Sequence, residues 1–347
     1  MTKTLVLALL AALPLSGKEN ARPSGAARPS APPEALAVLR RSLEPPQQPY
    51  SAELAVARPE PGQGQAASRR LTVRFSPPNL YRREILGPAG ATARLIVEDG
   101  RTEWIYDPER RKVWKGEPAD PFFKRFGPEE EFDRLNENYD VAIASGEPVA
   151  GRSTWLLTLR SRSGGIPARR LWVDRRSFLL LRAEARRSDG TLGDAMRMTR
   201  LRLGAAQDQA LFRFSPPAGS TVVARAEPDY LALDEAKAAG FAPRLPTWLP
   251  SGYVFESLSI IPKGRRSVVH YRFSDGLSVL SLFQCPPRVR LDLGARLNRR
   301  VKLSSGRGYA TRTAEGSVLS WNSGGWRFVL VGPASDETLR RVAESVR

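Results

Sequence analysis

The chain has 347 residues, of which 41% are hydrophobic and 26% charged, so we expect a folded protein of about two domains. It contains one His and one Cys, His270 and Cys285, which excludes an intrachain disulfide and a zinc site built from Cys and His. The net charge is +18, from 54 basic and 36 acidic residues. This surplus suits acidic partners such as phosphate, lipopolysaccharide or acidic protein, but dispersed arginines on solvated surfaces explain it equally well.

The first 33 residues predict export followed by a flexible tether. A short basic start precedes an unbroken apolar run over residues 5–13, which is typical of a secretory signal peptide and too short to span a bilayer as a helix. Lys18 stands where a bacterial lipoprotein would carry its lipidated Cys, so we expect no lipid anchor. We assign residues 1–17 to the signal peptide and residues 18–33, rich in Pro, Ala, Ser and Gly, to a disordered linker.

Strand signals dominate the chain from residue 71 to residue 203. Apolar and polar residues alternate over 71–76, and turn sequences such as Asp99-Gly100 separate further short runs. Between Met196 and Leu203 the apolar positions change parity, which indicates a β-bulge. Because short connections join antiparallel neighbours, this series predicts a large antiparallel sheet that is strongly curved or barrel-like. Strands are expected at 71–76, 81–86, 93–98, 102–106, 112–115, 141–144, 154–160, 170–174, 179–186 and 196–203.

Helical segments are predicted to cover one face of this sheet. An amphipathic helix is expected over 34–43, and two short helices are expected within 120–138, on either side of Gly127-Pro128. The second segment presents aromatic residues at mostly helical spacing, and these are the candidates for the covering helices: Phe122, Phe123, Phe126 and Phe132.

A smaller α+β domain follows. Residues 231–240 predict a short helix, and prolines at 243, 246 and 250 mark a boundary. Ser335 is the expected N-cap of a C-terminal helix. The expected domains are therefore 34–225, a connecting helix and linker over 226–243, and a second domain over 244–347, with strands at 253–261, 267–273, 278–285, 308–313, 317–321 and 326–331.

No motif for catalysis accompanies these domains. The sequence has no phosphate-binding loop, no dinucleotide-binding glycine motif and no nucleophile elbow. His270 lies in an apolar strand with no partner carboxylate or nucleophile nearby in sequence, so a packed His is the better interpretation. We expect no enzyme, no metal and no cofactor, and the export signal argues against a nucleic-acid partner.

The aromatic residues of the chain, among them seven Trp and 13 Phe, suggest a ligand-binding face instead. One face of a half-barrel is filled by helices or holds a ligand, and a loosely filled face would accept acyl chains. An ordinary packed core explains the same residues, and the sequence leaves both alternatives open. The candidates for lining such a cavity are Phe75, Tyr81, Trp104, Trp155, Leu157 and Trp172.

Several of these segments resemble known families. The larger domain is similar to the lipoprotein-carrier (LolA-like) half-barrel in the runs Phe75-Ser76-Pro77, Asp99-Gly100-x-x-x-Trp104-x-Tyr106-Asp107-Pro108, Leu171-Trp172-Val173-Asp174 and Phe214-x-Pro216-Pro217-x-Gly219. The smaller domain resembles the MucB/RseB family of periplasmic sigma-factor regulators in Leu245-Pro246-x-Trp248-Leu249-Pro250-x-Gly252-Tyr253, Tyr271-x-x-Ser274-Asp275-Gly276-Leu277-Ser278-x-x-Ser281-x-Phe283 and the stretch from Trp326 to the C-terminal helix. The chain departs from the family pattern at Gln284-Cys285, where an acidic residue is expected.

The resemblance implies a non-enzymatic periplasmic regulator. Such a protein binds the extracytoplasmic segment of a membrane anti-sigma factor, protects it from proteolysis and lets go when a lipid, lipoprotein or lipopolysaccharide ligand binds. The alternative is a periplasmic carrier of lipids or lipoproteins that holds acyl chains in the half-barrel. The second domain favours the regulator, because a carrier needs only the half-barrel.

Overall fold

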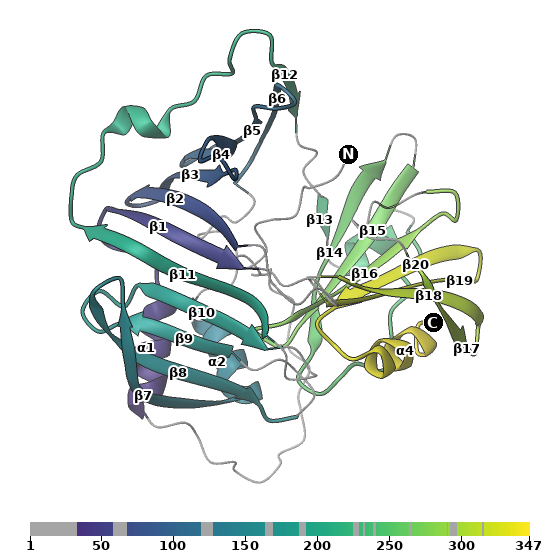
Figure 1. Ribbon diagram of the computed structural model, residues 1–347. Helices are drawn as coiled ribbons and strands as arrows, with labels where there is room; N and C mark the ends of the chain where they lie inside the picture. The colour runs from purple at the N-terminus through teal and green to yellow at the C-terminus, as the bar shows by residue number, and fades with distance from the viewer. Residues whose placement is uncertain are drawn as a thin grey trace.

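The computed structural model contains two β-sheets, each formed by its own part of the chain (Figure 1). The structure describes residues 33–57, 68–118, 128–163, 169–186, 192–224, 229–231, 233–238, 241–263, 266–289, 291, 297–313 and 316–347. The larger sheet contains β1 (Tyr50–Ala57), β2 (Ser68–Ser76), β3 (Leu80–Leu86), β4 (Thr92–Asp99), β5 (Glu103–Asp107), β6 (Lys112–Gly116), β7 (Tyr139–Val149), β8 (Arg152–Ser161), β9 (Arg169–Asp174), β10 (Leu180–Arg186), β11 (Leu192–Leu203) and β12 (Thr221–Ala224).

The larger sheet is open. Its strand order is β12-β6-β5-β4-β3-β2-β1-β11-β10-β9-β8-β7, so the pairing of β1 with β11 joins two meanders and the end strands do not meet. The strands change direction progressively across the sheet, as Figure 1 shows. Such a progressive change of direction follows from the intrinsic twist of β-strands. The prediction of a mostly β, half-barrel fold is confirmed.

Two features of this sheet differ from the sequence prediction. β1 was not among the expected strands, because alanines stand on both of its sides, at 52, 55 and 57, and weaken the alternation. β12 pairs with β6 in parallel, so the prediction of an entirely antiparallel sheet is wrong at this edge. The long connection from β11 to β12, which contains the short helix η1 (Gln209–Phe212), lets the chain return in the parallel direction.

The predicted bulge is confirmed in β11. Glu53 of β1 lies opposite Arg200, whereas its neighbour Leu54 lies opposite Met198, so Thr199 is the extra residue. The Thr199 hydroxyl donates a hydrogen bond of 3.1 Å to the Glu53 carbonyl. The bulge explains the parity change in the sequence, because one additional residue restores the apolar side chains to the same face.

Two helices lie on one face of the larger sheet, behind β8 to β10 in Figure 1. They are α1 (Pro33–Leu43) and α2 (Pro128–Asn138), which match the expected helix over 34–43 and the second of the two helices expected within 120–138. The first of those two falls on residues outside the described part of the chain. We call the face that carries α1 and α2 the helix face, and the opposite face the outer face.

The smaller sheet also joins two meanders, through the pairing of β16 with β20. Every strand and helix predicted for it from the sequence is present, and Ser335 caps the last helix by accepting a hydrogen bond from the Thr338 amide. Strands β13 and β17 were not predicted, and β13 lies within the expected linker over 226–243. The elements are β13 (Asp229–Leu231), α3 (Leu233–Ala238), β14 (Val254–Lys263), β15 (Arg266–Ser274), β16 (Val279–Cys285), β17 (Arg299–Leu303), β18 (Gly306–Thr313), β19 (Gly316–Ser323), β20 (Trp326–Gly332) and α4 (Asp336–Glu344).

Candidate functional site

The two helices bury one end of the helix face. Leu39 of α1 and Leu135 of α2 pack with Leu157 and Leu159 of β8 in one apolar cluster. Phe132, a covering residue expected from the sequence, is buried in the same cluster, and the Arg40 guanidinium lies 4.5 Å from its ring centroid. The other three expected covering residues, Phe122, Phe123 and Phe126, lie outside the described residues.

The apolar helix face continues beyond these helices across the sheet. Direct cross-strand pairs carry it from β8 to β1 through Leu157, Leu171, Ala183, Met196 and Val56. Further along β1, Tyr50 lies opposite Phe75, which in turn lies opposite Tyr81. Trp155 lies two residues from Leu157 on the same strand. Four of the six expected lining residues, Phe75, Tyr81, Trp155 and Leu157, therefore share the helix face.

These four residues form two separate groups on that face. Phe75 is fully buried, with its ring centroid 4.6 Å from that of Tyr81 and 5.3 Å from that of Tyr50. Trp155 and Leu157 instead pack with the cluster beneath α1 and α2. The aromatic group is therefore the part of the helix face farther from the two helices.

Trp104 and Trp172 lie on the outer face. Trp104 pairs with Val97, and its neighbour Glu103 pairs with Glu98, which lies opposite Tyr81. Because successive side chains of a strand point to opposite faces, Trp104 points away from Tyr81. The same argument separates Trp172 from Leu171 and places it beside Leu156. Trp172 is nevertheless buried in the same apolar cluster as Phe75, with Tyr81 packed against it, whereas Trp104 belongs to none of the apolar clusters of the described residues.

Both Trp residues have other contacts on the outer face. The ring of Trp104 lies 5.8 Å from that of Phe214, in the segment that follows η1. Trp172 is buried, with the Arg182 guanidinium 4.1 Å from its ring centroid.

A charged group interrupts the apolar helix face beside the aromatic residues. Arg83 of β3 forms a salt bridge with Glu98 of β4, and its guanidinium lies 5.0 Å from the ring centroid of Tyr81. Burial by itself would lower the pKa of Arg83, but the carboxylates of Glu98 and Glu103 hold that pKa above its ordinary value. The charge of Arg83 is therefore balanced within the protein by the carboxylates beside it.

A second candidate region lies where the two sheets meet. The Tyr139 hydroxyl, at the start of β7, donates a buried hydrogen bond of 2.7 Å to the Asp275 carboxylate in the turn between β15 and β16. The Asn138 side-chain amide donates to the backbone carbonyls of Asp275 and Gly252, at 2.9 and 3.2 Å. We call these contacts the joint. They connect the C-terminal end of α2 directly to two turns of the smaller domain.

Asp275 is satisfied almost entirely by neutral donors. Besides the Tyr139 hydroxyl, it accepts hydrogen bonds from the backbone amides of Leu277 and Ser278, at 2.9 and 2.6 Å. Burial raises the pKa of Asp275, and the hydrogen bonds from Tyr139 and the two amides oppose this rise. Burial and the neighbouring carboxylate likewise raise the pKa of Tyr139 above its ordinary value. The hydrogen bond between Tyr139 and Asp275 is therefore buried where the two domains meet.

Two glycines allow the close approach at the joint. Gly252 and Gly276 have φ angles of +87° and +93°, a conformation that favours glycine. A Cβ on Gly252 would lie 2.6 Å from the Asn138 side-chain oxygen, and one on Gly276 would lie 3.0 Å from the Leu135 backbone nitrogen. Both glycines belong to the runs that resemble the MucB/RseB family, so the structure gives these runs a physical role.

The sequence analysis interpreted Ser274-Asp275-Gly276 only as a turn between strands. Such a tripeptide carries no sign of which distant residue it will meet, because Tyr139 lies 136 positions away.

The departure at Gln284 has a structural explanation. Its side-chain oxygen accepts hydrogen bonds from the Tyr271 hydroxyl and the Arg244 amide, at 2.6 and 3.1 Å. Its side-chain nitrogen donates to the Ala242 carbonyl at 3.2 Å. A carboxylate could not make this last bond, so Gln284 fits the interior of the smaller domain rather than a partner surface.

The reactive side chains of the smaller domain are packed. His270 stacks on Phe283 with ring centroids 4.3 Å apart, and burial lowers its pKa to about 3. Cys285 is buried, and burial raises its pKa. Within the described residues no group of three or more His, Cys, Asp and Glu side chains could hold a metal ion.

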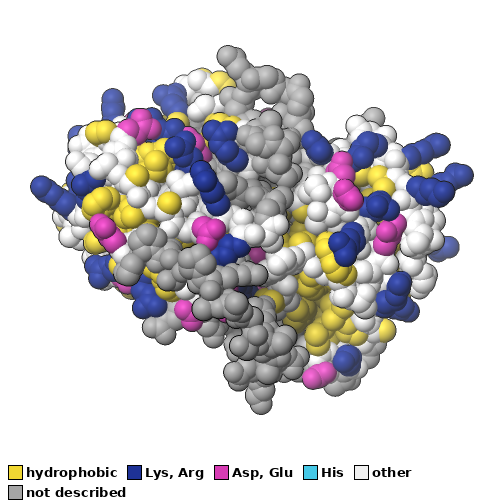
Figure 2. All heavy atoms as spheres, turned by 90° about the horizontal axis from the view of Figure 1, so that it is seen from below, with side chains coloured by type: hydrophobic (Ala, Val, Ile, Leu, Met, Phe, Trp, Pro, Cys, Tyr) yellow, Lys and Arg dark blue, Asp and Glu magenta, His cyan; other side chains and the backbone are white. Residues whose placement is uncertain are grey.

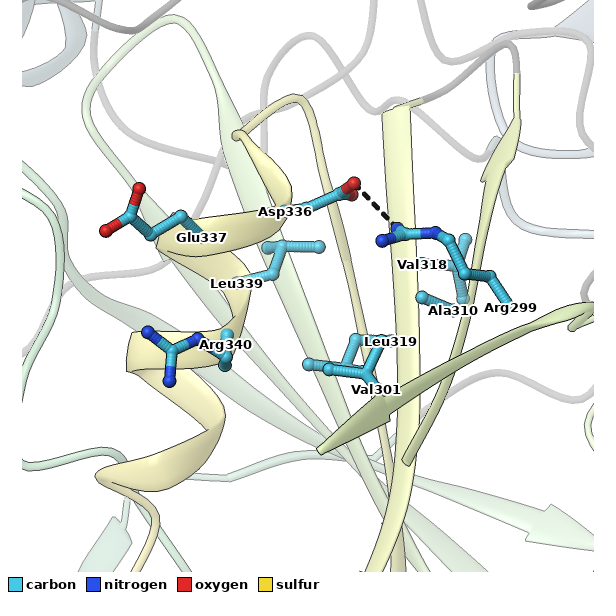
Figure 3. Close-up of a pocket in the computed structure, with 9 residues that line it drawn as sticks. All are labelled: Arg299, Val301, Ala310, Val318, Leu319, Asp336, Glu337, Leu339 and Arg340. Carbon is cyan, nitrogen blue, oxygen red and sulfur yellow. Dashed lines mark hydrogen bonds and ion pairs between the residues drawn. The ribbon is translucent and has the colours of Figure 1, made fainter. Parts of the chain in front are cut away.

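A narrow crevice of about 220 Å³ separates the first turn of α4 from β17 to β19 (Figure 3). Its floor is apolar, formed by Val301, Val318 and Leu339 among others, and an ion pair of 2.6 Å between Arg299 and Asp336 lies at its rim. The floor residues Val318 and Leu339 are only 2% and 1% exposed. The crevice is therefore a shallow gap at the sheet edge with little surface to offer a ligand.

Basic side chains are spread over both halves of the molecule in Figure 2, with acidic ones among them, and apolar side chains gather on the half that holds the smaller sheet. No helix in the described part of the chain is long and apolar enough to cross a membrane.

Comparisons with known proteins agree with this architecture. Residues 90–215 match the family model of the MucB/RseB N-terminal domain. A crystal structure of MucB in complex with MucA(peri) has a TM-score of 0.59 at 21% identity, over 90% of this chain and 97% of that one. The MucA/MucB complex of Pseudomonas aeruginosa has a TM-score of 0.58 at 22% identity, over 90% of this chain and 98% of that one.

A structure of MucB alone has a TM-score of 0.51 at 22% identity, with the same coverage as the Pseudomonas complex. A comparison with curated protein sequences finds no match. The matched residues run from β4 to the segment after η1, and the shared fold extends through the smaller sheet. Over residues 90–215 the chain is therefore similar to the MucB/RseB N-terminal domain, and it shares the two-domain fold of MucB.

Proposed function

We propose that this protein is a periplasmic, non-enzymatic regulator that binds the extracytoplasmic segment of a membrane anti-sigma factor. Bound in this way, the segment is protected from proteolysis. Binding of a lipid, lipoprotein or lipopolysaccharide ligand to the half-barrel causes the anti-sigma-factor segment to dissociate. The observation that carries the proposal is the family match of the larger domain together with a fold shared along both domains with MucB, a protein solved in complex with MucA(peri).

The two-domain arrangement supports regulation over transport. A carrier of acyl chains needs only the half-barrel, whereas here the smaller domain is attached through a buried hydrogen bond from Tyr139 and a partly buried one from Asn138. Buried polar contacts specify one arrangement of the two domains rather than a loose tether. A partner segment would then meet a defined surface formed by both.

Helix α2 offers a path from ligand to partner. Its Leu135 side chain is buried under the half-barrel cluster, and its last residue, Asn138, holds two turns of the smaller domain. An acyl chain entering between α2 and the sheet would move the helix and disturb the joint. A ligand that favours the disturbed form would lower the affinity for the partner by linkage.

The proposal is tested by calorimetric titration of the purified mature protein with the extracytoplasmic segment of the membrane anti-sigma factor encoded beside its gene. We expect a stoichiometric complex with a dissociation constant of about 1 μM or lower. A value of 1 μM corresponds to a binding free energy of about −8 kcal/mol. The cytoplasmic segment of the same anti-sigma factor is the control. Absence of binding to the extracytoplasmic segment would exclude the function.

Ligand response is tested separately with a lysophospholipid below its micelle concentration. We expect it to weaken partner binding by roughly 5- to 150-fold, the usual range of coupling between two sites. If the lipid binds but leaves partner affinity unchanged, the release step is wrong while the regulator assignment stands.

A further inference from the structure

Five arginines lie exposed on the outer face of the three central strands of the larger sheet. Arg197, Arg200 and Arg202 come from β11, and Arg70 and Arg74 come from β2. Register places all five on one side, because each faces Ser51, Glu53 or Ala55 of β1, the residues that alternate with the buried ones. We call this array the basic face.

The basic face has a regular geometry. Arg202 and Arg74 both lie opposite Ser51, and Arg197 and Arg70 both lie opposite Ala55. Strands two apart in a sheet are separated by about 10 Å, and four residues along a strand cover about 13 Å. The four outer arginines therefore originate near the corners of a rectangle of these dimensions.

Few side chains in the described part of the chain neutralise this charge. Arg200 pairs with Glu53 at 3.2 Å, and both side chains are more than half exposed. Arg70, Arg74, Arg197 and Arg202 make no ion pair or hydrogen bond with the described residues. Like charges about 10 Å apart repel one another at ordinary ionic strength, so the array costs folding free energy. An external anion would relieve that cost.

The adjacent arginine shows the contrast. Arg82 of β3 lies opposite Arg74, but it pairs with Glu84 at 2.7 Å and donates to the carbonyl of Leu211 beside η1. The η1 segment covers the outer face at β3 and β4, and the basic face begins where that cover ends. On this side the basic face therefore ends at β2.

The residues between the arginines limit what the basic face can bind. They are small or polar, with Ser51 and Ala55 on β1 and Thr72 on β2, so no aromatic ring is present for base stacking and no large apolar side chain is present to anchor a protein. Guanidinium groups bind phosphate oxygens bidentately. We propose that the basic face docks the protein on the surface of a bilayer containing anionic phospholipid.

Co-sedimentation with vesicles tests this docking, using phosphatidylglycerol mixed with phosphatidylcholine and phosphatidylcholine alone. The full chain should sediment with the anionic vesicles at about 0.1 M salt and not at about 1 M, where the Debye length falls to about 3 Å. The face variant carries Arg70→Ser, Arg74→Ser, Arg197→Ser and Arg202→Ser. It should bind the anionic vesicles more than about 100-fold more weakly, because each basic side chain near an anionic surface contributes about fivefold.

A matched variant removes the same net charge from exposed positions of the smaller domain, Arg266→Ser, Arg300→Ser, Lys302→Ser and Arg307→Ser. It should bind the anionic vesicles far better than the face variant does. Equal losses in the two variants would mean that net charge alone attracts the protein, and the proposal would be wrong. It would also be overturned if the unchanged protein did not sediment with anionic vesicles. Thermal unfolding of both variants confirms that they are folded.

Discussion

The carboxylate of Asp275 is buried away from solvent, and the Tyr139 hydroxyl donates a hydrogen bond to it. Asp275 is fully buried and has a raised pKa, so its stability depends on each donor that faces it. Replacing Tyr139 by Phe leaves the ring in place and removes only the hydroxyl. A buried acceptor that loses one partner costs about 1–3 kcal/mol. The Tyr139 hydroxyl is therefore the one contact of the joint that reaches the buried carboxylate, beside the two hydrogen bonds from Asn138.

We predict that Tyr139→Phe lowers the free energy of unfolding by about 1–3 kcal/mol in urea denaturation. In the Asp275→Asn background the same change should cost clearly less, because the charged acceptor is gone. The double-mutant cycle gives a coupling energy of about 1 kcal/mol or more. Strictly additive effects of the two substitutions would show that the hydrogen bond does not stabilise the fold.

The glycines of the joint make a second prediction, for which the chain provides its own control. Gly252→Ala and Gly325→Ala both place Ala at a positive φ, +87° and +80°. A Cβ at 252 meets Asn138 at 2.6 Å, whereas none of the described atoms lies within 4 Å of a Cβ at 325. Gly325→Ala should cost about 1 kcal/mol of stability through backbone strain, and Gly252→Ala clearly more. Equal losses of stability in the two variants would show that the contact between residue 252 and Asn138 does not restrict the side chain at 252.

His270 predicts sensitivity to acid. The pKa of His270 is about 3 in the folded protein, below the ordinary value of 6.5. Between these two pH values the imidazole is protonated in the unfolded chain and neutral in the folded protein. Stability contributed by the neutral imidazole is therefore present above pH 6.5 and is lost as the pH falls. Between pH 7 and pH 5 the loss should be about 2 kcal/mol.

His270→Phe should remove most of this slope, because the chain has no other His. The measurement is the urea midpoint of both proteins at intervals between pH 7 and pH 5. An unchanged slope in the variant would show that the ring is solvated.

At the scale of elements, α2 belongs to both halves of the molecule. Leu135 is 1% exposed within the half-barrel cluster, while its backbone nitrogen faces Gly276 of the smaller domain. Leu339 of α4 is equally buried but belongs to the smaller domain's own core. The two leucines thus separate loss of packing from loss of domain contact.

We predict that Leu135→Ala and Leu339→Ala each lower stability by about 2–5 kcal/mol. Only Leu135→Ala should also speed hydrogen exchange at the amides of Leu277 and Ser278, which are hydrogen-bonded to Asp275. The readout is exchange measured by mass spectrometry under native conditions. Similar acceleration in both variants would mean that the joint responds to overall stability rather than to α2.

Elements with a strong pattern were predictable from the sequence, and those whose form depends on distant partners were not. Period two and turn residues located most strands, and the parity change in 196–203 located the bulge at Thr199. β12 and β13 are short strands that exist because a partner strand lies beside them, so no local pattern marks them. The same holds for the expected lining residues. The sequence predicts that Trp104 and Trp172 lie on strands, but only the strand register determines which face of the sheet each side chain occupies.

At the scale of the whole molecule, two open sheets are held together by a buried joint, and one helix contacts both. This arrangement suits a protein that grips a partner and changes its grip, rather than one that transforms a substrate. The surface features separate in the same way, because the basic face lies on the outer side of the larger sheet and the joint lies beside the helix face. The proposed docking surface and the joint are therefore separate regions of the molecule.

Protection of the partner from cleavage tests the regulator most directly. The extracytoplasmic segment of the anti-sigma factor is incubated with the periplasmic protease that cuts it, with and without this protein in stoichiometric amount, and cleavage is followed over time. The account predicts slow cleavage in the presence of the protein and faster cleavage when a lysophospholipid is added. Cleavage at the same rate with and without the protein would contradict it.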